Sequence, residues 1–171
     1  MGYIGEGYGI MMDRVNCIWK HKDYKSYYEQ IEECEKDRIF CHHDMVHFVD
    51  VARIGWIISL EENINVDKEL LYAAALLHDI GRHLQYTQNI PHEIASGQLA
   101  PDILTDCGFN AAEIDIVLDA IVNHRNKNIK DERSLRGVLY RADKMSRACA
   151  FCKAEPECDW SDEKKNMGIV S

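Results

Sequence analysis

The chain has 171 residues, a length typical of one domain, and 46% of them are hydrophobic, which is enough to form a buried core. Its formal net charge of −9 argues against a nucleic-acid-binding surface, because such a surface requires clustered positive charge. Apolar runs such as the one around residues 54–58 are far shorter than the roughly 20 residues of a membrane-spanning helix. Composition therefore predicts one domain whose partners include neither a nucleic-acid polymer nor a membrane.

Hydrophobic residues recur with a helical period nearly throughout the chain, and no segment shows the alternation typical of a strand. The first predicted helix contains Tyr24 and ends near Arg38. Further helices are predicted at about 43–60, 69–80, 92–100, 101–107, 110–124 and 134–152. The predicted fold class is therefore all-α, a single bundle of about six to seven helices. It spans residues 21–155, between a flexible lead-in at 1–20 and a polar tail at 156–171.

The predicted helix at 69–80 is apolar on nearly all sides, which is typical of a buried central element. Asp67 suits the N-cap position of this helix, and Gly81 suits its end. We therefore expect the other helices to pack around this one.

Prolines and a capping pattern predict the boundaries of the helices that follow residue 81. Pro91 and Pro101 each suit the first turn of a helix, so two short helices are expected there, after a loop at 82–90. Asn110 and Glu113 have the spacing of a capping box, which predicts the start of the next helix.

Four side chains with metal-binding chemistry fall at buried positions of different predicted helices. His47 lies on the core-facing stripe of the second helix, and Asp143 lies beside the buried side of the last one. His78 and Asp79 end the central helix, where an unpaired carboxylate would be costly. One divalent cation can satisfy two histidines and two carboxylates together, so the sequence predicts a metal site.

Together these residues resemble the HD superfamily of metal-dependent phosphohydrolases, whose signature is H…HD…D. Residues 43–52, HDMVHFVDVA, are similar to its first-ligand helix, and residues 73–82, AAALLHDIGR, are similar to its central element. Residues 141–145, RADKM, are similar to its terminal aspartate element. The resemblance covers roughly residues 40–147. It implies an all-helical fold and hydrolysis by metal-activated water.

Two further histidines extend the pattern to H…HD…H…H…D, with His92 in PHEIASG and His124 at the end of AIVNH. This longer pattern is similar to binuclear members, among them HD-GYP phosphodiesterases and bacterial symmetrical diadenosine tetraphosphate hydrolases. The GYP tripeptide is absent, so that branch is not assigned. The resemblance implies that His47, His78, Asp79 and Asp143 bind one metal. It also implies that Asp79 bridges to a second metal, which His92 and His124 hold.

The sequence leaves the roles of three histidines open. His92 and His124 would alternatively lie outside the coordination sphere, and His43, one helical turn before His47, is expected to support the ligands rather than join them. The metal is one or two divalent ions, with iron, manganese, nickel, cobalt, zinc and magnesium all open.

Two arginines are predicted to act on the substrate beside the catalytic Asp79. Arg82 stands where the family commonly has lysine, and Arg125 directly follows His124; both are either phosphate clamps or solvated charges. Residues 124–147 carry eight Lys and Arg against three Asp and Glu, a local charge of +5. Such a patch on an acidic chain favours a small anionic substrate, such as a nucleotide. Alternatively, these basic residues form an exposed helix face that pairs with acidic residues elsewhere in the chain.

The expected activity is therefore hydrolysis of a phosphate ester or anhydride, as a phosphomonoesterase, phosphodiesterase or nucleotide pyrophosphohydrolase. Two alternatives stay open. The resemblance also covers a few di-iron oxygenases with the same ligands, which here would act on a small anionic substrate. The fold would equally suit a non-catalytic nucleotide-binding regulator. A homodimer is open as well.

The seven cysteines are an odd number, and the first residues lack the basic start and apolar run of a signal peptide. We therefore expect reduced thiols in a cytoplasmic protein. Cys149, Cys152 and Cys158 form a CxxC pair with a third cysteine, so a structural metal is an open alternative to ordinary thiols. The fourth sulfur of such a site would come from one of the three earlier cysteines Cys17, Cys34 or Cys41.

Overall fold

The computed structural model describes residue 9 and residues 11–169, and all regular structure in that part of the chain is helical. The α-helices are α1 (Asp13–Lys20), α2 (Lys22–Glu35), α3 (Met45–Glu61), α4 (Lys68–Leu77), α5 (Arg82–Gln88), α6 (His92–Asp106), α7 (Ala111–Asn123) and α8 (Leu135–Met145). Short 3-10 turns are η1 (Lys127–Ile129), η2 (Cys149–Phe151), η3 (Glu155–Glu157) and η4 (Asp162–Lys164). The all-α prediction is confirmed. No described helix is long and apolar enough to cross a membrane.

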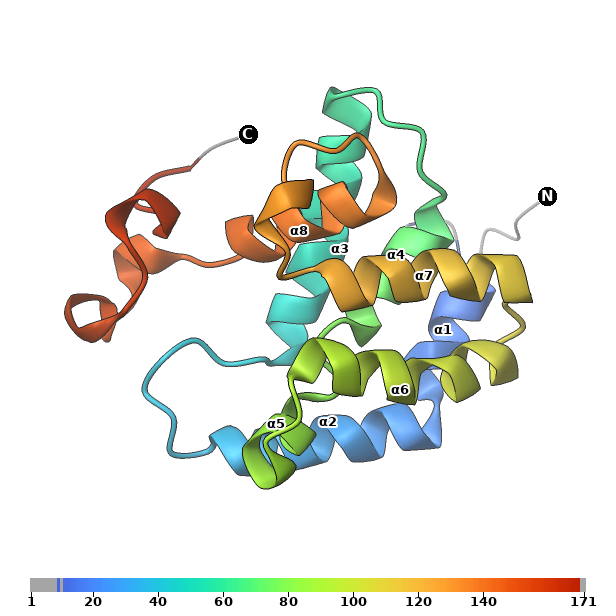
Figure 1. The fold of residues 1–171 in the computed structure, drawn as a ribbon, viewed down its shortest axis with the longest axis horizontal. Helices are drawn as coiled ribbons and strands as arrows, with labels where there is room; N and C mark the ends of the chain where they lie inside the picture. Colours follow the sequence, from blue (N-terminus) through green and yellow to red (C-terminus); the bar gives the residue numbers. More distant parts are fainter. Residues whose placement is uncertain (1–8, 10, 170–171) are drawn as a thin grey trace.

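Helix α4 is the centre of the bundle, as its apolar sequence predicts. Leu71 and Leu77 are fully buried, and so are the three alanines between them. The small alanines let α1, α3, α7 and α8 pack closely against this helix, while α6 lies along α7 (Figure 1). The Asp67 side chain accepts a hydrogen bond from the Leu70 amide at 3.0 Å, which confirms the predicted N-cap.

Helix α1 lies inside the segment predicted to be a flexible lead-in, so that prediction is wrong for Asp13–Lys20. Val15 and Ile18 are buried in the core. Arg14 joins the helix to its neighbours, because its guanidinium donates to Glu69 on α4 and Glu113 on α7 at 2.8 Å each. These tertiary contacts stabilise a helix of only eight residues, which is too short to be stable alone. Residues 1–8 and 10 lie outside the described part.

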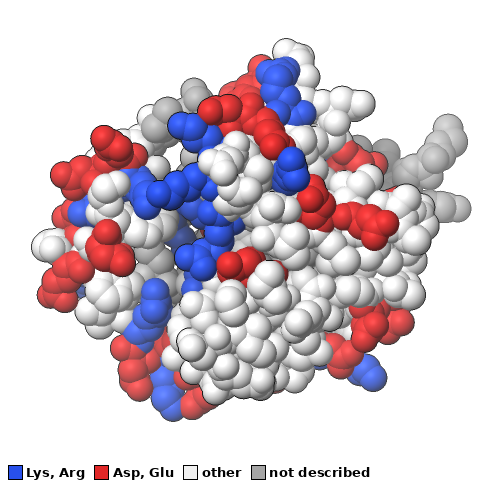
Figure 2. Space-filling view, viewed as in Figure 1, with Lys and Arg blue, Asp and Glu red and all other residues white. Residues whose placement is uncertain are grey.

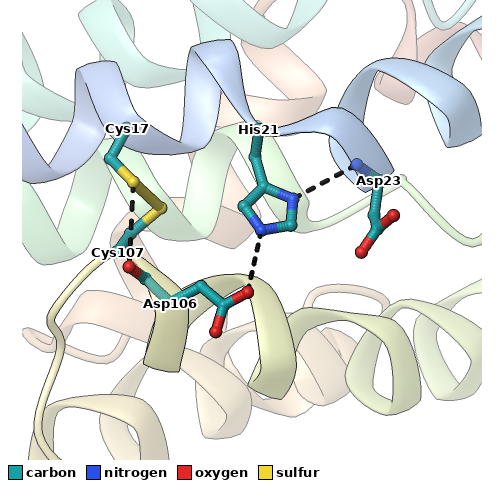
Figure 3. Close-up of a disulfide and its surroundings, with 5 residues drawn as sticks. All are labelled: Cys17, His21, Asp23, Asp106 and Cys107. Carbon is teal, nitrogen blue, oxygen red and sulfur yellow. Dashed lines mark hydrogen bonds and ion pairs between the residues drawn. A yellow bond between two sulfur atoms is a disulfide. The ribbon is translucent and has the colours of Figure 1, made fainter.

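A disulfide joins Cys17 of α1 to Cys107 at the end of α6, so the expectation of seven reduced thiols is wrong for this pair (Figure 3). The two Cα atoms are 5.4 Å apart. The His21 ring lies 3.3 Å from the Asp106 carboxylate beside the bond. The 90 residues between the cysteines hide this pairing from sequence reasoning, since only the packing of α1 on α6 brings them together. The cytoplasmic location stays a prediction.

The segment predicted as a loop at 82–90 contains helix α5, so that prediction is wrong. Tertiary contacts again explain the difference. His83 is buried and stacks on Tyr27 of α2 with 5.3 Å between ring centroids. The Tyr86 hydroxyl donates to the Glu35 carboxylate at 2.6 Å.

Helix α6 runs through Pro101 without a break, whereas two separate helices were predicted. Proline removes one backbone hydrogen bond from a helix interior. The buried side chains Ala95, Ser96, Ala100, Ile103 and Leu104 lie on both sides of it and pack into the bundle. This packing outweighs the lost bond and keeps the helix continuous.

Helix α7 begins with the predicted capping box, in which Asn110 and Glu113 each bond the other's backbone amide. Helix α8 ends at Met145, seven residues before its predicted end at Cys152. The Asn166 side chain donates to the carbonyls of Lys144 and Arg147 at 2.7 and 2.8 Å, which satisfies groups that a longer helix would use. The chain beyond forms 3-10 turns.

Gly81 lies where the backbone after Asp79 touches α6. Its amide donates to the Ser96 hydroxyl at 2.9 Å. A Cβ at this position would lie 2.4 Å from the Ser96 nitrogen and 2.6 Å from the Ala95 Cβ. The absence of a side chain therefore permits this contact between the two segments.

We predict that Gly81→Ala lowers the free energy of unfolding by about 1–3 kcal/mol, because α6 must shift away to make room. Chemical denaturation measures the change. Gly168→Ala is the matched control, since a Cβ there meets nothing within 4 Å. Equal stability of the two variants would show that the contact is not tight.

Candidate metal centre

Five helices bring all six predicted ligands to one buried point. His47 comes from α3, Asp143 from α8 and His92 from the first residue of α6. His78 and His124 cap the C-terminal ends of α4 and α7, and Asp79 directly follows His78. Each of the six is at most 8% exposed. Residues spread over 97 positions of sequence thus meet within one core.

The Asp79 carboxylate lies between two sets of histidines. Its Oδ2 atom is 3.3 Å from His78 Nε2 and 3.8 Å from His47 Nε2. Its Oδ1 atom is 3.1 Å from His92 Nε2 and 3.5 Å from His124 Nε2. One oxygen therefore faces each set, which is the geometry of a bridging carboxylate.

The side chains form two groups, each compact enough to hold one ion. In both groups the donor atoms lie within 4.8 Å of one another. The first group is His47, His78, Asp79 and Asp143, and the second is Asp79, His92 and His124. Nitrogen and carboxylate donors in this mixture suit first-row divalent metals.

Each of these histidines turns its Nε2 atom inward and holds its Nδ1 atom on a protein acceptor or hydroxyl. His78 Nδ1 lies 2.7 Å from the Ala75 carbonyl, and His124 Nδ1 lies 2.6 Å from the Ile121 carbonyl. The remaining two partners are the Ser146 hydroxyl for His47 and the Gln85 side chain for His92. Bonds to carbonyls place the proton on Nδ1 and leave Nε2 free to bind a metal.

A divalent cation fits these residues because the centre contains polar atoms that the protein does not satisfy. His47 Nε2, His78 Nε2 and Asp79 Oδ1 are buried without a hydrogen-bond partner. Burying such atoms unpaired costs free energy. Cations bound at the two groups would coordinate these atoms, His47 and His78 in the first group and Asp79 Oδ1 in the second, and offset this cost.

Burial favours the neutral, metal-binding form of two of these histidines. It lowers the pKa of His47 to about 4 and that of His92 to about 2. Burial opposes a charge on His78 too, but the Asp79 and Asp143 carboxylates outweigh it and raise the pKa to about 9. Burial would raise the pKa of Asp79, yet the charges of His78 and Arg82 hold it well below its usual range. The carboxylate therefore stays ionised.

His43 lies in the loop before α3, so it does not share a helix face with His47 as the sequence suggested. Asp44 is the N-cap of α3. His43 Nε2 is 3.5 Å from Asp79 Oδ2, and its Nδ1 is 2.5 Å from the Glu35 carboxylate. It lies outside both ligand groups. Its place between Glu35 and Asp79 agrees with the predicted supporting role.

The centre opens into a cleft of about 780 Å³. Asp79, His92, His124 and Asp143 reach its wall, and both predicted arginines line it. Arg82 Nε is 3.6 Å from Asp79 Oδ1, whereas Arg125 is more than half exposed and lies 3.5 Å from the Glu93 carboxylate. Arg82 is therefore the arginine nearer to the metal ligands.

The basic segment at 124–147 divides between two surfaces. Four of its eight basic residues line the cleft: Arg125, Lys127, Lys144 and Arg147. Three others do not line the cleft and bond other parts of the chain instead. Arg133 donates to the carbonyls of Glu62 and Asn63. Arg136 bonds Asp119 and Glu132, and Arg141 bonds the Glu62 carboxylate. Three basic residues from other segments complete the lining: Arg38, Arg82 and Lys164. Figure 2 shows basic side chains gathered around the hollow, with acidic side chains mostly farther out.

The HD domain family matches residues 45–148, which contain all six candidate ligands. An uncharacterized protein of Clostridium beijerinckii is 46% identical over 158 residues, covering 92% of this chain and 99% of that protein. The chain therefore belongs to the HD domain family.

The fold is also similar to the crystal structure of a predicted HD superfamily hydrolase from an uncultured Thermotogales bacterium. The TM-score is 0.58 with 24% sequence identity, and the match covers 91% of this chain and 88% of that chain. This likeness supports the helical architecture described above.

We predict that Asp79→Ala abolishes metal binding, whereas His92→Ala reduces it from two ions per chain to one. The first change removes the shared ligand, and the second removes a ligand of one group only. Elemental analysis of protein dialysed against manganese measures the ratio, and circular dichroism should show helical content near wild type for both variants.

Asp115→Ala is the matched control, since Asp115 is an exposed carboxylate on α7. It should retain both ions. Full metal content in Asp79→Ala would contradict the bridging role.

Proposed function

We propose that this chain is a metal-dependent phosphohydrolase that cleaves a phosphate ester or anhydride of a small nucleotide-like substrate. The observation that carries the proposal is the Asp79 carboxylate, which has one oxygen facing each ligand group at the base of a basic cleft. When bound, divalent ions supply Lewis acidity, polarising phosphate oxygens and acidifying water.

The residues of the chain hold the reacting groups in place. The four histidine Nε2 atoms and the two carboxylates are held by helices, and each histidine is also fixed by a hydrogen bond at Nδ1, so the site is preorganised. Arg82 binds and orients a phosphate oxygen that approaches the Oδ1 side of Asp79. Arg125, at the rim, contacts a more distant part of the substrate.

The cleft supports a small anionic substrate rather than a polymer. Its volume of about 780 Å³ is within the range of small-molecule sites. Seven Lys and Arg line it against five Asp and Glu, two of which are the candidate ligands Asp79 and Asp143. The rest of the chain is acidic, so the positive field is local to the cleft.

Nitrogen and carboxylate ligands do not separate hydrolysis from oxygen chemistry, but the lining of the cleft favours an anionic substrate. Five arginine or lysine side chains near the ligands suit phosphate oxygens, and these are Arg38, Arg82, Arg125, Lys144 and Arg147. An oxygenase that acts on an anion would suit the same lining, so product analysis has to separate the two reactions. A purely binding protein does not require a complete ligand set.

The test is a panel of phosphomonoesters, phosphodiesters and nucleotides, run on protein whose metal content has been measured. Phosphate or nucleotide products should form at a rate that follows metal content. Oxygen uptake by iron-loaded protein without phosphate release would instead identify an oxygenase. Nucleotide binding without turnover would identify a regulator.

We predict that Arg82→Gln lowers kcat/KM by about 10- to 100-fold, the value of one charge-assisted hydrogen bond. Arg82→Lys should recover part of the loss, because it restores the charge but not the paired donors. Steady-state kinetics on the best substrate of the panel measures both changes.

Arg136→Gln is the control from the same basic segment, because Arg136 bonds Glu132 and Asp119 away from the cleft. It should leave kcat/KM near wild type. If Arg82→Gln also does so, Arg82 is a solvated charge and not a phosphate clamp.

A further inference from the structure

Four of the five free cysteines lie beside one another at the edge of the bundle. Cys41 belongs to the loop between α2 and α3, and the other three follow α8. More than 100 positions separate the loop from this tail, yet one cavity is lined by Cys41, Cys149, Cys152 and Cys158. Figure 1 shows the tail beyond the end of α8, on the same side of the bundle as the loop.

Interactions between the loop and the tail agree with this placement. Arg147 donates to the carbonyl of His42, next to Cys41, at 2.6 Å. Burial raises the pKa of the Cys41 thiol, Arg147 opposes this effect, and the neighbouring Cys152, Cys149 and Cys158 add to it. The thiols are therefore close enough to interact electrostatically.

The tail has almost no hydrophobic core that would fold it. In the described part of the chain, the core cluster and the residues packed on it end at Met145. Beyond that point only Cys149 and Ala154 are buried, while Phe151 is 91% exposed. Small segments that lack a core commonly depend on a metal or a disulfide for their structure. The tail after Met145 is a segment of this kind.

The structure also distinguishes between the three earlier cysteines. Cys17 is bonded to Cys107, and Cys34 is exposed on α2. Cys41 alone of the three lines the cavity with the tail thiols. The four cysteines all lie outside residues 45–148, the part that matches the HD domain family. Any site that they form is thus an addition to the family fold.

We propose that Cys41, Cys149, Cys152 and Cys158 bind one structural zinc ion, which fastens the tail to the loop before α3. Four thiolates form the closed tetrahedral site typical of structural zinc. Cys149 begins the turn η2 and Cys152 directly follows it, and the Cys152 amide donates to the Cys149 carbonyl at 3.0 Å. This turn gives the CxxC pair the compact backbone that a shared ion requires.

The four sulfur atoms lie farther apart than the donor atoms of the His/Asp groups. In the described chain, no three of these sulfur atoms lie within 4.8 Å of one another. Zinc binding therefore requires side-chain rotations. Cys41, Cys152 and Cys158 have room for this motion, because they are half-buried in the wall of the cavity.

The proposed zinc would also shape the catalytic cleft. Cys41, Cys158 and Trp160 line both the cysteine cavity and the cleft. Fastening the tail thus fixes Trp160 and the nearby Lys164 in the cleft wall. The proposal does not depend on the reaction at the His/Asp centre.

The test uses the full-length Asp79→Ala variant, so that zinc at the His/Asp centre does not obscure the count. We expect one zinc per chain, and X-ray absorption should show about four sulfur neighbours at about 2.3 Å. Cys152→Ser and Cys158→Ser in this background should each lose the zinc, whereas the control Cys34→Ser should keep it. A first shell of nitrogen and oxygen, unchanged zinc in the cysteine variants, or iron with sulfide would each overturn the proposal.

A second measurement on the unmodified protein avoids variants that fail to fold. Iodoacetamide should alkylate Cys34 at once and leave the four clustered cysteines protected until a chelator removes the zinc. Mass spectrometry of the peptides measures each site. Alkylation of Cys41, Cys152 and Cys158 at the rate of Cys34 before chelation would overturn the proposal as well.

Discussion

The buried carboxylate of Asp79 is the constraint on which the rest of this structure depends. An ionised group that is 2% exposed must be compensated, and histidines from four helices surround it. The bundle has to bring the ends of α4 and α7 and the starts of α3 and α6 to one point. The alanine-rich α4 and the Gly81 contact with α6 make that close approach possible. This convergence also leaves buried histidine nitrogens and a carboxylate oxygen without hydrogen-bond partners, and divalent cations can bind such atoms.

The features that are local in sequence were predicted well. The helical period gave the positions of α2, α3, α4 and α7, and the caps at Asp67 and Asn110 lie where expected. The predictions of helix boundaries are wrong where tertiary packing determines whether a segment is helical. Helix α1 is stable because Arg14 and two buried side chains join it to the bundle, and α6 continues through Pro101 because both flanks are packed. The Cys17–Cys107 bond depends on the same packing and left no trace in the spacing.

The candidate site was more predictable than the boundaries of the helices. Ordered His and Asp residues at core positions indicated which side chains converge, and the structure brings all six together. Sequence could not show that the two Asp79 oxygens face different groups, nor that His43 stands between Glu35 and Asp79 outside the helix. It left open whether the basic residues of 124–147 form a patch at the cleft or an exposed face paired with acidic residues. The structure divides them, since Arg136 and Arg141 bond acidic side chains and do not line the cleft. Those distinctions depend on side-chain direction, which a linear pattern does not contain.

We propose that Asp79 bridges two divalent ions that act on phosphate. Anomalous X-ray diffraction from crystals grown with manganese locates such ions directly. We expect two anomalous peaks roughly 3.5–4 Å apart. One should lie beside Asp79 Oδ2, near His47, His78 and Asp143. The other should lie beside Asp79 Oδ1, near His92 and His124. A single peak, or two peaks of which one does not contact Asp79, would contradict it.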